Sequence, residues 1–191
     1  MLQELQQYID EKLGDVVLTS YISYGELNVT VKQESILDSL VFLQADKKCR
    51  FISFIDISVV DFPQNKNRFQ LSYHLLSPKH NIRIRIKLFT NSTTPVSSIC
   101  SIFSGAEWYE REAYDMYGVL FKDHPDLRRI LTDYGFEGHP LRKDFPVTGF
   151  VECRYDNELK KIVYEPVMLR QEMRIFDSLS PWSGKETETG E

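Results

Sequence analysis

A short segment in the middle of the chain gathers carboxylates that could hold a metal ion or work as an acid and a base. Glu110, Glu112 and Asp115 lie close together along the sequence, and His124 follows soon after. Carboxylate oxygens are ligands for hard divalent cations, and histidine exchanges protons near neutral pH. One hypothesis is therefore a small acid/base or metal-dependent enzyme that uses these four residues.

The same segment permits a structural interpretation in which the charges neutralise one another. Arg111 stands four residues after Glu107 and four before Asp115, the spacing of neighbours on one helix face. Residue types alone favour a ladder of such ion pairs, because no nucleophile lies nearby. The chain also holds no HxH, HExxH, GxGxxG, Walker or GxSxG pattern, so sequence motifs indicate neither a nucleotide pocket nor covalent catalysis.

Composition narrows the class of protein further. The net charge of -5 and the pI of about 5.5 argue against a nucleic-acid binder, which needs basic residues to neutralise phosphates. Cys49, Cys100 and Cys153 are widely spaced, so we expect reduced, structural thiols rather than a disulfide framework or a metal cluster. No apolar run is long enough to span a membrane, and residues 1–14 resemble neither a secretory signal nor a mitochondrial transit peptide.

Hydrophobic periodicity predicts the elements that must position these residues. The expected strands are joined by short turns, which favours a mainly antiparallel sheet flanked by helices, an α+β fold. The predicted helices are 2–13, 36–43, 95–103 and 106–117, and the predicted strands are 16–24, 27–31, 50–62, 69–76 and 82–88.

Four of these elements carry more specific expectations. The strand 50–62 is apolar on both faces, which is typical of a central strand. The strand 82–88 alternates isoleucine or leucine with a basic stripe, so its outer side is either a solvated face or an edge that meets an acidic partner. Pro95 suits the first turn of a helix, and the run 104–107 resembles a capping box that would start the helix at 106, with Gly118 ending it.

After Phe121 the periodicity stops, and we predict three parts: an α+β domain at 1–121, an extended arm at 122–182 and a disordered tail at 183–191. The arm is rich in prolines and glycines, yet it keeps spaced aromatic residues and a balance of positive and negative charges. Disordered tails are depleted in aromatic residues, so an arm that wraps around another folded protein explains this composition better.

The sequence around the carboxylates resembles a known family over a long run. The segments 110–118, 124–131 and 132–146, followed by Arg154-Tyr155 and Pro181-Trp182, closely resemble the 30-kDa subunit of respiratory complex I, known in bacteria as the C subunit. The matched motif or interface positions are Glu110, Arg111, Glu112, Asp115, His124, Asp126, Arg128, Arg129, Asp133, Arg142, Asp144, Arg154, Tyr155, Phe176 and Trp182.

This resemblance implies a quinone-module subunit in the peripheral arm of proton-pumping NADH:ubiquinone oxidoreductase. Such a subunit has no catalytic group and serves assembly and stability, while FMN, iron–sulfur clusters and ubiquinone are expected on other subunits. The expected partners are the 49-kDa quinone-site subunit and its neighbours. The implied location is the matrix side of the mitochondrial inner membrane, or the cytoplasmic face of the plasma membrane in a bacterium.

Overall fold

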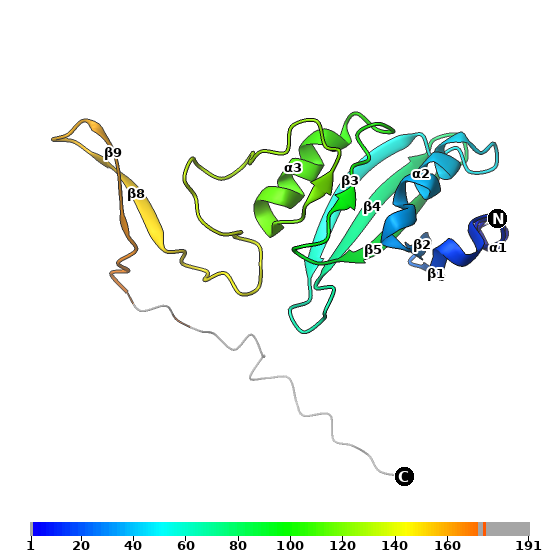
Figure 1. Ribbon diagram of the computed structural model, residues 1–191, viewed down its shortest axis with the longest axis horizontal. Coiled ribbons are helices and arrows are strands. Elements are labelled where there is room, and N and C mark those ends of the chain that lie inside the picture. The colour runs from blue at the N-terminus through cyan, green and yellow to red at the C-terminus, as the bar shows by residue number, and fades with distance from the viewer. Residues whose placement is uncertain (1, 172–173, 175–191) are drawn as a thin grey trace, which may run out of the picture. The chain divides into compact units, whose positions relative to one another are not determined.

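The computed structural model describes residues 2–171 and residue 174, and its contacts divide the chain into two compact units (Figure 1). The first unit ends at Val147 and the second begins at Thr148. Residues 122–147 therefore lie in the first unit, although they were predicted to belong to the arm. Phe176, Trp182 and the predicted tail 183–191 lie outside the described residues.

A five-stranded sheet forms the centre of the first unit, in the order β1-β2-β5-β4-β3. Neighbouring strands run antiparallel except β2 and β5, which are parallel, so the predicted α+β class with a mainly antiparallel sheet is confirmed. The strands of this sheet are β1 (Val17–Ser23), β2 (Glu26–Val31), β3 (Ser53–Asp61), β4 (Phe69–Ser77) and β5 (Ile82–Thr90). The helices are α1 (Leu2–Leu13), α2 (Ile36–Ala45) and α3 (Ala106–Tyr117), with 3-10 turns η1 (Gly14–Val16) and η2 (Gln33–Ser35).

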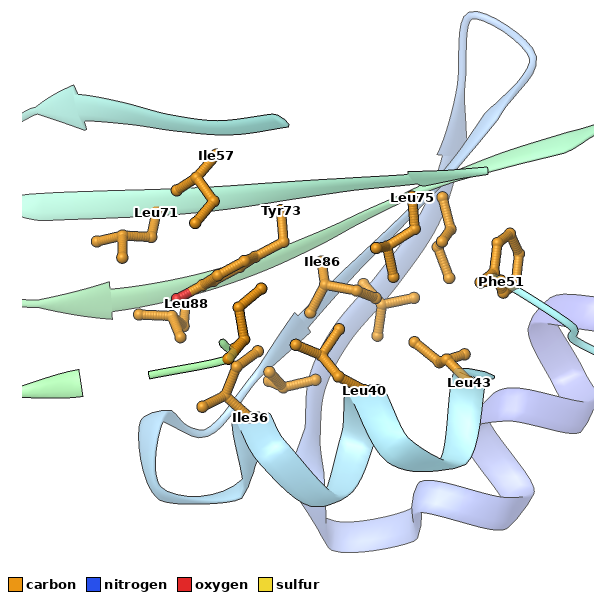
Figure 2. Close-up of a cluster of buried hydrophobic side chains, with 14 of the residues drawn as sticks. Ile36, Leu40, Leu43, Phe51, Ile57, Leu71, Tyr73, Leu75, Ile86 and Leu88 are labelled. Carbon is orange, nitrogen blue, oxygen red and sulfur yellow. The ribbon is translucent and has the colours of Figure 1, made fainter. Parts of the chain in front are cut away.

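The core lies between one face of this sheet and the helices. Alternate residues of β4 and β5, among them Tyr73 and Ile86, point from the sheet toward Leu40 and its neighbours on α2 (Figure 2). Helix α3 covers the same face, since Tyr117 packs edge to face on Phe69 with ring centroids 6.4 Å apart. Each fully buried apolar side chain contributes roughly 1.5–3 kcal/mol, so this face fixes where α3 and its carboxylates lie.

Two strands occupy different places from those predicted. Strand β3 lies at the edge of the sheet and pairs with β4, not in the centre. Strand β5 lies between β2 and β4, so its basic stripe is on a face of the sheet and not at an edge. Arg85 there pairs with Glu26 at 3.2 Å, and Lys87 donates to the hydroxyl of Tyr21. The edge interpretation of this stripe was therefore wrong, because local alternation does not reveal a strand's neighbours.

The helix predicted at 95–103 does not form. Its first residues instead form a short strand, β6 (Val96–Ser97). This strand pairs in parallel with β7 (Phe121–Lys122), which follows α3 in the sequence. The N–H of Ile99 then donates to the carboxylate of Glu110 at 2.7 Å. These long-range hydrogen bonds replace the helical ones expected after Pro95. Nor does α3 start with the expected capping box: Gly105 is its N-cap, with no side-chain hydrogen bond.

The second unit contains a β-hairpin that sequence periodicity did not predict. Strands β8 (Val151–Asp156) and β9 (Lys161–Pro166) pair in an antiparallel register, from Val151 opposite Pro166 to Asp156 opposite Lys161. We expected no regular secondary structure after Phe121, and this prediction was wrong for residues 151–166. The two strands are short, and the prolines and glycines near them are typical of loops, so their alternation did not predict a hairpin.

Candidate functional site

The three carboxylates of α3 point in different directions. At about 100° per residue, Glu112 lies about 200° around the helix from Glu110, and Asp115 lies about 140° from Glu110. Glu110 and Asp115 are fully buried, whereas Glu112 is exposed. The three acids therefore do not converge on one point, and the enzyme hypothesis loses the geometry it requires.

Asp115 is the centre of a dense network that binds the segment after β7. One oxygen, Oδ2, accepts the backbone N–H groups of Ile130, Leu131 and Thr132 at 2.7 to 3.0 Å. The other, Oδ1, accepts the hydroxyl of Thr132 at 2.6 Å and the guanidinium of Arg129 at 3.2 Å. A single carboxylate thus satisfies three consecutive backbone donors in a stretch that has no regular secondary structure of its own.

These contacts determine the charge state of Asp115. Burial by itself would raise the pKa of this carboxyl, but the hydrogen bonds from Thr132, Leu131 and Ile130 outweigh it, and the pKa is lowered. Asp115 is therefore a stable anion with every bond direction in use. A group of this kind positions a chain segment and has no free lone pair with which to accept a substrate proton.

Further contacts fix the same segment along α3. Arg111 donates to the carbonyl oxygens of Arg128 and Arg129, each at 3.1 Å. Arg129 reaches on from Asp115 to the carbonyl of Gly138 at 2.9 Å. Arg111 and Asp115 thus have partners 14 to 18 residues away rather than four, so the ladder predicted within the helix is replaced by contacts to the following segment.

The end of α3 is closed by two more side chains. Nδ1–H of His139 donates to the carbonyl of Asp115 at 2.9 Å, and Arg142 donates to the carbonyl of Tyr117 at 2.6 Å. Gly118 ends the helix in the left-handed region, at φ 74°, as predicted. A Cβ at Gly118 would collide with both His139 and Arg142, so this position requires glycine for its backbone and for its neighbours.

A second acidic centre lies around Asp61, which the sequence analysis missed, and it includes Asp144, which the sequence analysis had singled out. Arg68 forks onto buried Asp61, with Nε at 2.7 Å and Nη2 at 2.6 Å from its oxygens, and also pairs with Asp144 at 3.1 Å. The N–H of Lys143 donates to Asp61 as well, at 2.8 Å. The hydrogen bond from Arg68 lowers the pKa of Asp61. The sequence did hold a signal for Asp61. This residue continues the alternation of Ile57 and Val59 on the core-facing side of the strand, and a buried acid needs a partner there.

Glu110 lies in a separate buried polar cluster with Cys100 and His124. Besides Ile99 N–H, it accepts the thiol of Cys100 at 3.5 Å. His124 accepts the N–H of Asp126 at Nδ1, so its proton is on Nε2 and donates to the carbonyl of Glu107, each at 3.0 Å. Nε2 of this ring also lies 3.9 Å from the carboxylate of Glu110. Burial raises the pKa of Glu110, against hydrogen bonds from Ser98 and Ile99.

The ligand atoms of Cys100, Glu110 and His124 lie within 4.8 Å of one another, the kind of grouping that could hold a metal ion. Their chemistry does not fit one well. Burial raises the pKa of Cys100 to about 11, and Glu110 already accepts the N–H of Ile99 and the thiol of Cys100. His124 would also have to give up one of its two hydrogen bonds. The cluster is better explained as a hydrogen-bonded part of the core.

The other matched positions are spread over both units. Arg128 is 72% exposed and pairs with Asp126 at 2.8 Å, and Asp133 is exposed. Glu112 lines a surface groove with the exposed side chains of Trp108 and Leu131. In the second unit Arg154 pairs with Glu165 at 2.9 Å, and Tyr155 is exposed. The structure thus brings Arg111, Asp115 and Arg129 together around residues 128–132, and it brings Glu110 and His124 together in a separate cluster.

No helix in the described range, 2–171, has the length and apolar character needed to cross a bilayer.

Comparison with known proteins gives one consistent family. The sequence profile described as "Respiratory-chain NADH dehydrogenase, 30 Kd subunit" matches residues 29–151. The C subunit of NADH-quinone oxidoreductase from Bartonella henselae is 61% identical over 97% of this chain and 92% of that protein. The protein of the same name from Sinorhizobium medicae is 62% identical, with the same coverage.

A solved structure agrees with these sequences. A chain in the structure of the membrane-bound sulfane sulfur reductase, an archaeal respiratory membrane complex, superposes with a TM-score of 0.65 and 25% identity. The match covers 75% of this chain and 85% of that one. The resemblance seen around Glu110 to Phe145 is confirmed: this chain belongs to the family of 30 Kd subunits of the respiratory-chain NADH dehydrogenase.

Proposed function

We propose that this chain is a subunit of a bacterial NADH–quinone oxidoreductase and that it contributes assembly and stability rather than a redox step. The observation that carries this proposal is the 61 to 62% identity, over nearly the whole chain, to proteins named as the C subunit of that enzyme. Identity this high along both chains supports the same place in the same complex.

The geometry of α3 supports a structural role within that complex. Asp115 and Arg111 use their polar groups to hold residues 128–132, and His139 and Arg142 hold the end of the helix. The alternative, a small enzyme that uses Glu110, Glu112, Asp115 and His124, is not favoured. Two of its acids are buried and accept hydrogen bonds from within the chain, and the third is exposed on another side of the helix.

The proposal extends to cofactors and partners. FMN, iron–sulfur clusters and the quinone would be held by other subunits, and this chain would contact the 49-kDa quinone-site subunit and its neighbours in the quinone module. A peripheral position in a membrane complex fits a described chain without a spanning helix. Both relatives compared above are bacterial, so of the two predicted locations they favour the face of a bacterial membrane over the mitochondrial one.

The test is affinity purification of the tagged chain from detergent-solubilised membranes of its own organism. We expect it to recover a multi-subunit assembly that reduces quinone with NADH, while the chain expressed alone is colourless and contains neither flavin nor iron. A stoichiometric chromophore in the isolated chain, or recovery of the tagged chain without NADH-oxidising partners, would refute the proposal.

A further inference from the structure

The β8–β9 hairpin separates its side chains by polarity. Residues that pair across two strands project to the same side, and the next pair projects to the other side. The register of this hairpin therefore puts three pairs on one face, all without charge: Val151 with Pro166, Cys153 with Tyr164, and Tyr155 with Ile162.

The opposite face carries the charges, and three of them form ion pairs within the hairpin. Its pairs are Glu152 with Glu165, Arg154 with Val163, and Asp156 with Lys161. Arg154 lies 2.9 Å from Glu165 and 3.3 Å from Asp156. Arg154 is thus held by two acids of its own face. Burial against another surface would therefore stabilise mainly the uncharged face, because it removes apolar side chains from water.

That uncharged face is open in the isolated chain. Val151, Tyr155, Ile162 and Tyr164 are each 58 to 59% exposed. A two-stranded hairpin with an uncovered apolar face is marginally stable in water, and three strands or a packed surface are normally needed. Four large side chains exposed to the same degree, on one side only, therefore indicate a surface that is completed by something else.

We infer that the face formed by Val151, Cys153, Tyr155, Ile162, Tyr164 and Pro166 packs against an apolar surface of a different folded subunit of the complex. The inference rests on the proposed function, since it needs a complex to supply that subunit. Two tyrosines fit such a contact, because their rings bury apolar area while their hydroxyls reach polar atoms at the rim.

A second copy of this chain is the less suitable occupant. Two strands of six residues cover roughly 10 by 20 Å, or about 200 Å². A stable interface buries about 800 Å² on each partner, so two hairpins stacked face to face would not hold a dimer. A different subunit that also contacts this chain elsewhere supplies the missing area.

Cys153 provides a direct probe, because it is exposed at the centre of this face. The other two thiols are natural controls. Burial raises the pKa of Cys49 to about 12 and that of Cys100 to about 11, so neither is a good nucleophile at neutral pH. N-ethylmaleimide should therefore modify Cys153 selectively in the free chain, and the fraction modified can be read by mass spectrometry after denaturation.

The experiment compares the free chain with the same chain in the purified complex. We expect modification of Cys153 to be at least about tenfold slower in the complex, because interface cores are packed as densely as protein interiors. Equal rates in the two samples would overturn the inference while leaving the proposed function intact. A free chain that forms stable dimers with Cys153 protected would overturn it in favour of a second copy. Absence of the chain from an NADH-oxidising complex would refute both.

A matched pair of variants tests the face itself. Ile162→Thr changes the uncharged face and Val163→Thr changes the charged face one residue later, and both keep a β-branched residue in the strand. We expect Ile162→Thr to lower the amount of chain retained in the complex roughly tenfold through lost apolar contact, and Val163→Thr to leave it unchanged. Equal losses in both variants would mean that the hairpin's fold, and not its uncharged face, is what matters.

Discussion

At the scale of single residues, the main finding is how much backbone one buried carboxylate organises. Asp115 accepts three consecutive N–H groups that would otherwise be unpaired, together with Thr132 and Arg129. Residues 128–132 have no regular secondary structure, so their polar groups need partners from elsewhere. A carboxylate with a lowered pKa serves this purpose well, because charge-assisted hydrogen bonds are the stronger ones.

Asp115→Asn should be strongly destabilising. The amide nitrogen would donate where an oxygen now accepts, so some donors would lose their partner at a cost of about 3 kcal/mol in the free energy of unfolding. Urea unfolding of the isolated chain, followed by far-UV circular dichroism, measures this loss. The matched control is Asp126→Asn, whose exposed ion pair with Arg128 should change stability by less than about 0.5 kcal/mol. Equal effects of the two substitutions would contradict a special role for Asp115.

The pH dependence of stability follows from the buried and ion-paired carboxylates of the first unit. The pKa values of Asp61, Asp115 and Asp144 are lowered in the folded chain. A lowered folded pKa gives stability that is complete above the unfolded value, about 3.9, and is lost as the pH falls through the folded value. We therefore expect stability to drop steeply below about pH 4, with a shallower drop in Asp61→Asn. The urea midpoint of unfolding, measured at several pH values below and above pH 4, gives this dependence. If the midpoint of Asp61→Asn fell with pH as steeply as that of the unmodified chain, the result would count against the Arg68–Asp61 contact.

At the scale of elements, the end of α3 is the most constrained turn in the first unit. Gly118 has a left-handed backbone, and its open side is filled by His139 and Arg142, which hold the last carbonyls of the helix. Burial lowers the pKa of His139, consistent with a neutral ring that donates from Nδ1. The turn thus joins the helix cap to residues more than twenty positions later.

Gly118→Ala should cost more than the left-handed conformation alone explains. Gly135→Ala is the matched control, because Gly135 also has a positive φ of 77° but nothing lies within 4 Å of its would-be Cβ. A left-handed alanine costs roughly 1–2 kcal/mol, and we expect the collision at Gly118 to add about 2 kcal/mol. Thermal unfolding of both variants makes the comparison. Equal melting temperatures would show that His139 and Arg142 do not fill this space.

Sequence periodicity predicted the elements whose faces pack on the core, and it failed where partners are distant. The alternation in 82–88 and the helical spacing in 2–13 and 106–117 each matched an observed element. It could not show that β3 lies at an edge, that 96–97 pairs with 121–122, or that Asp61 binds Arg68, because these depend on contacts far along the chain. The motif around Asp115 was found, but its role as an anchor required coordinates.

At the scale of the whole molecule, the chain combines a unit with a closed core and a unit whose described part contains a hairpin with one exposed, uncharged face. Residues up to Val147 have a closed core and two acidic anchors, at Asp61 and Asp115. The hairpin that follows leaves its uncharged face exposed. This division suits a subunit that is rigid before assembly and gains its last contacts from a partner. Whether the segment from 122 onward wraps that partner stays a prediction.

We propose that this chain supports assembly and takes no part in the chemistry, and Arg129→Gln is the variant that separates these two roles. Arg129 is 29% exposed and bridges Asp115 to Gly138, so its loss should weaken the fold by one to a few kcal/mol. The measurement is the amount of assembled complex in membranes together with NADH–quinone turnover per assembled complex. We expect the abundance of the complex to fall several-fold while turnover per complex stays within about twofold. Normal abundance with a collapse of turnover per complex would contradict it.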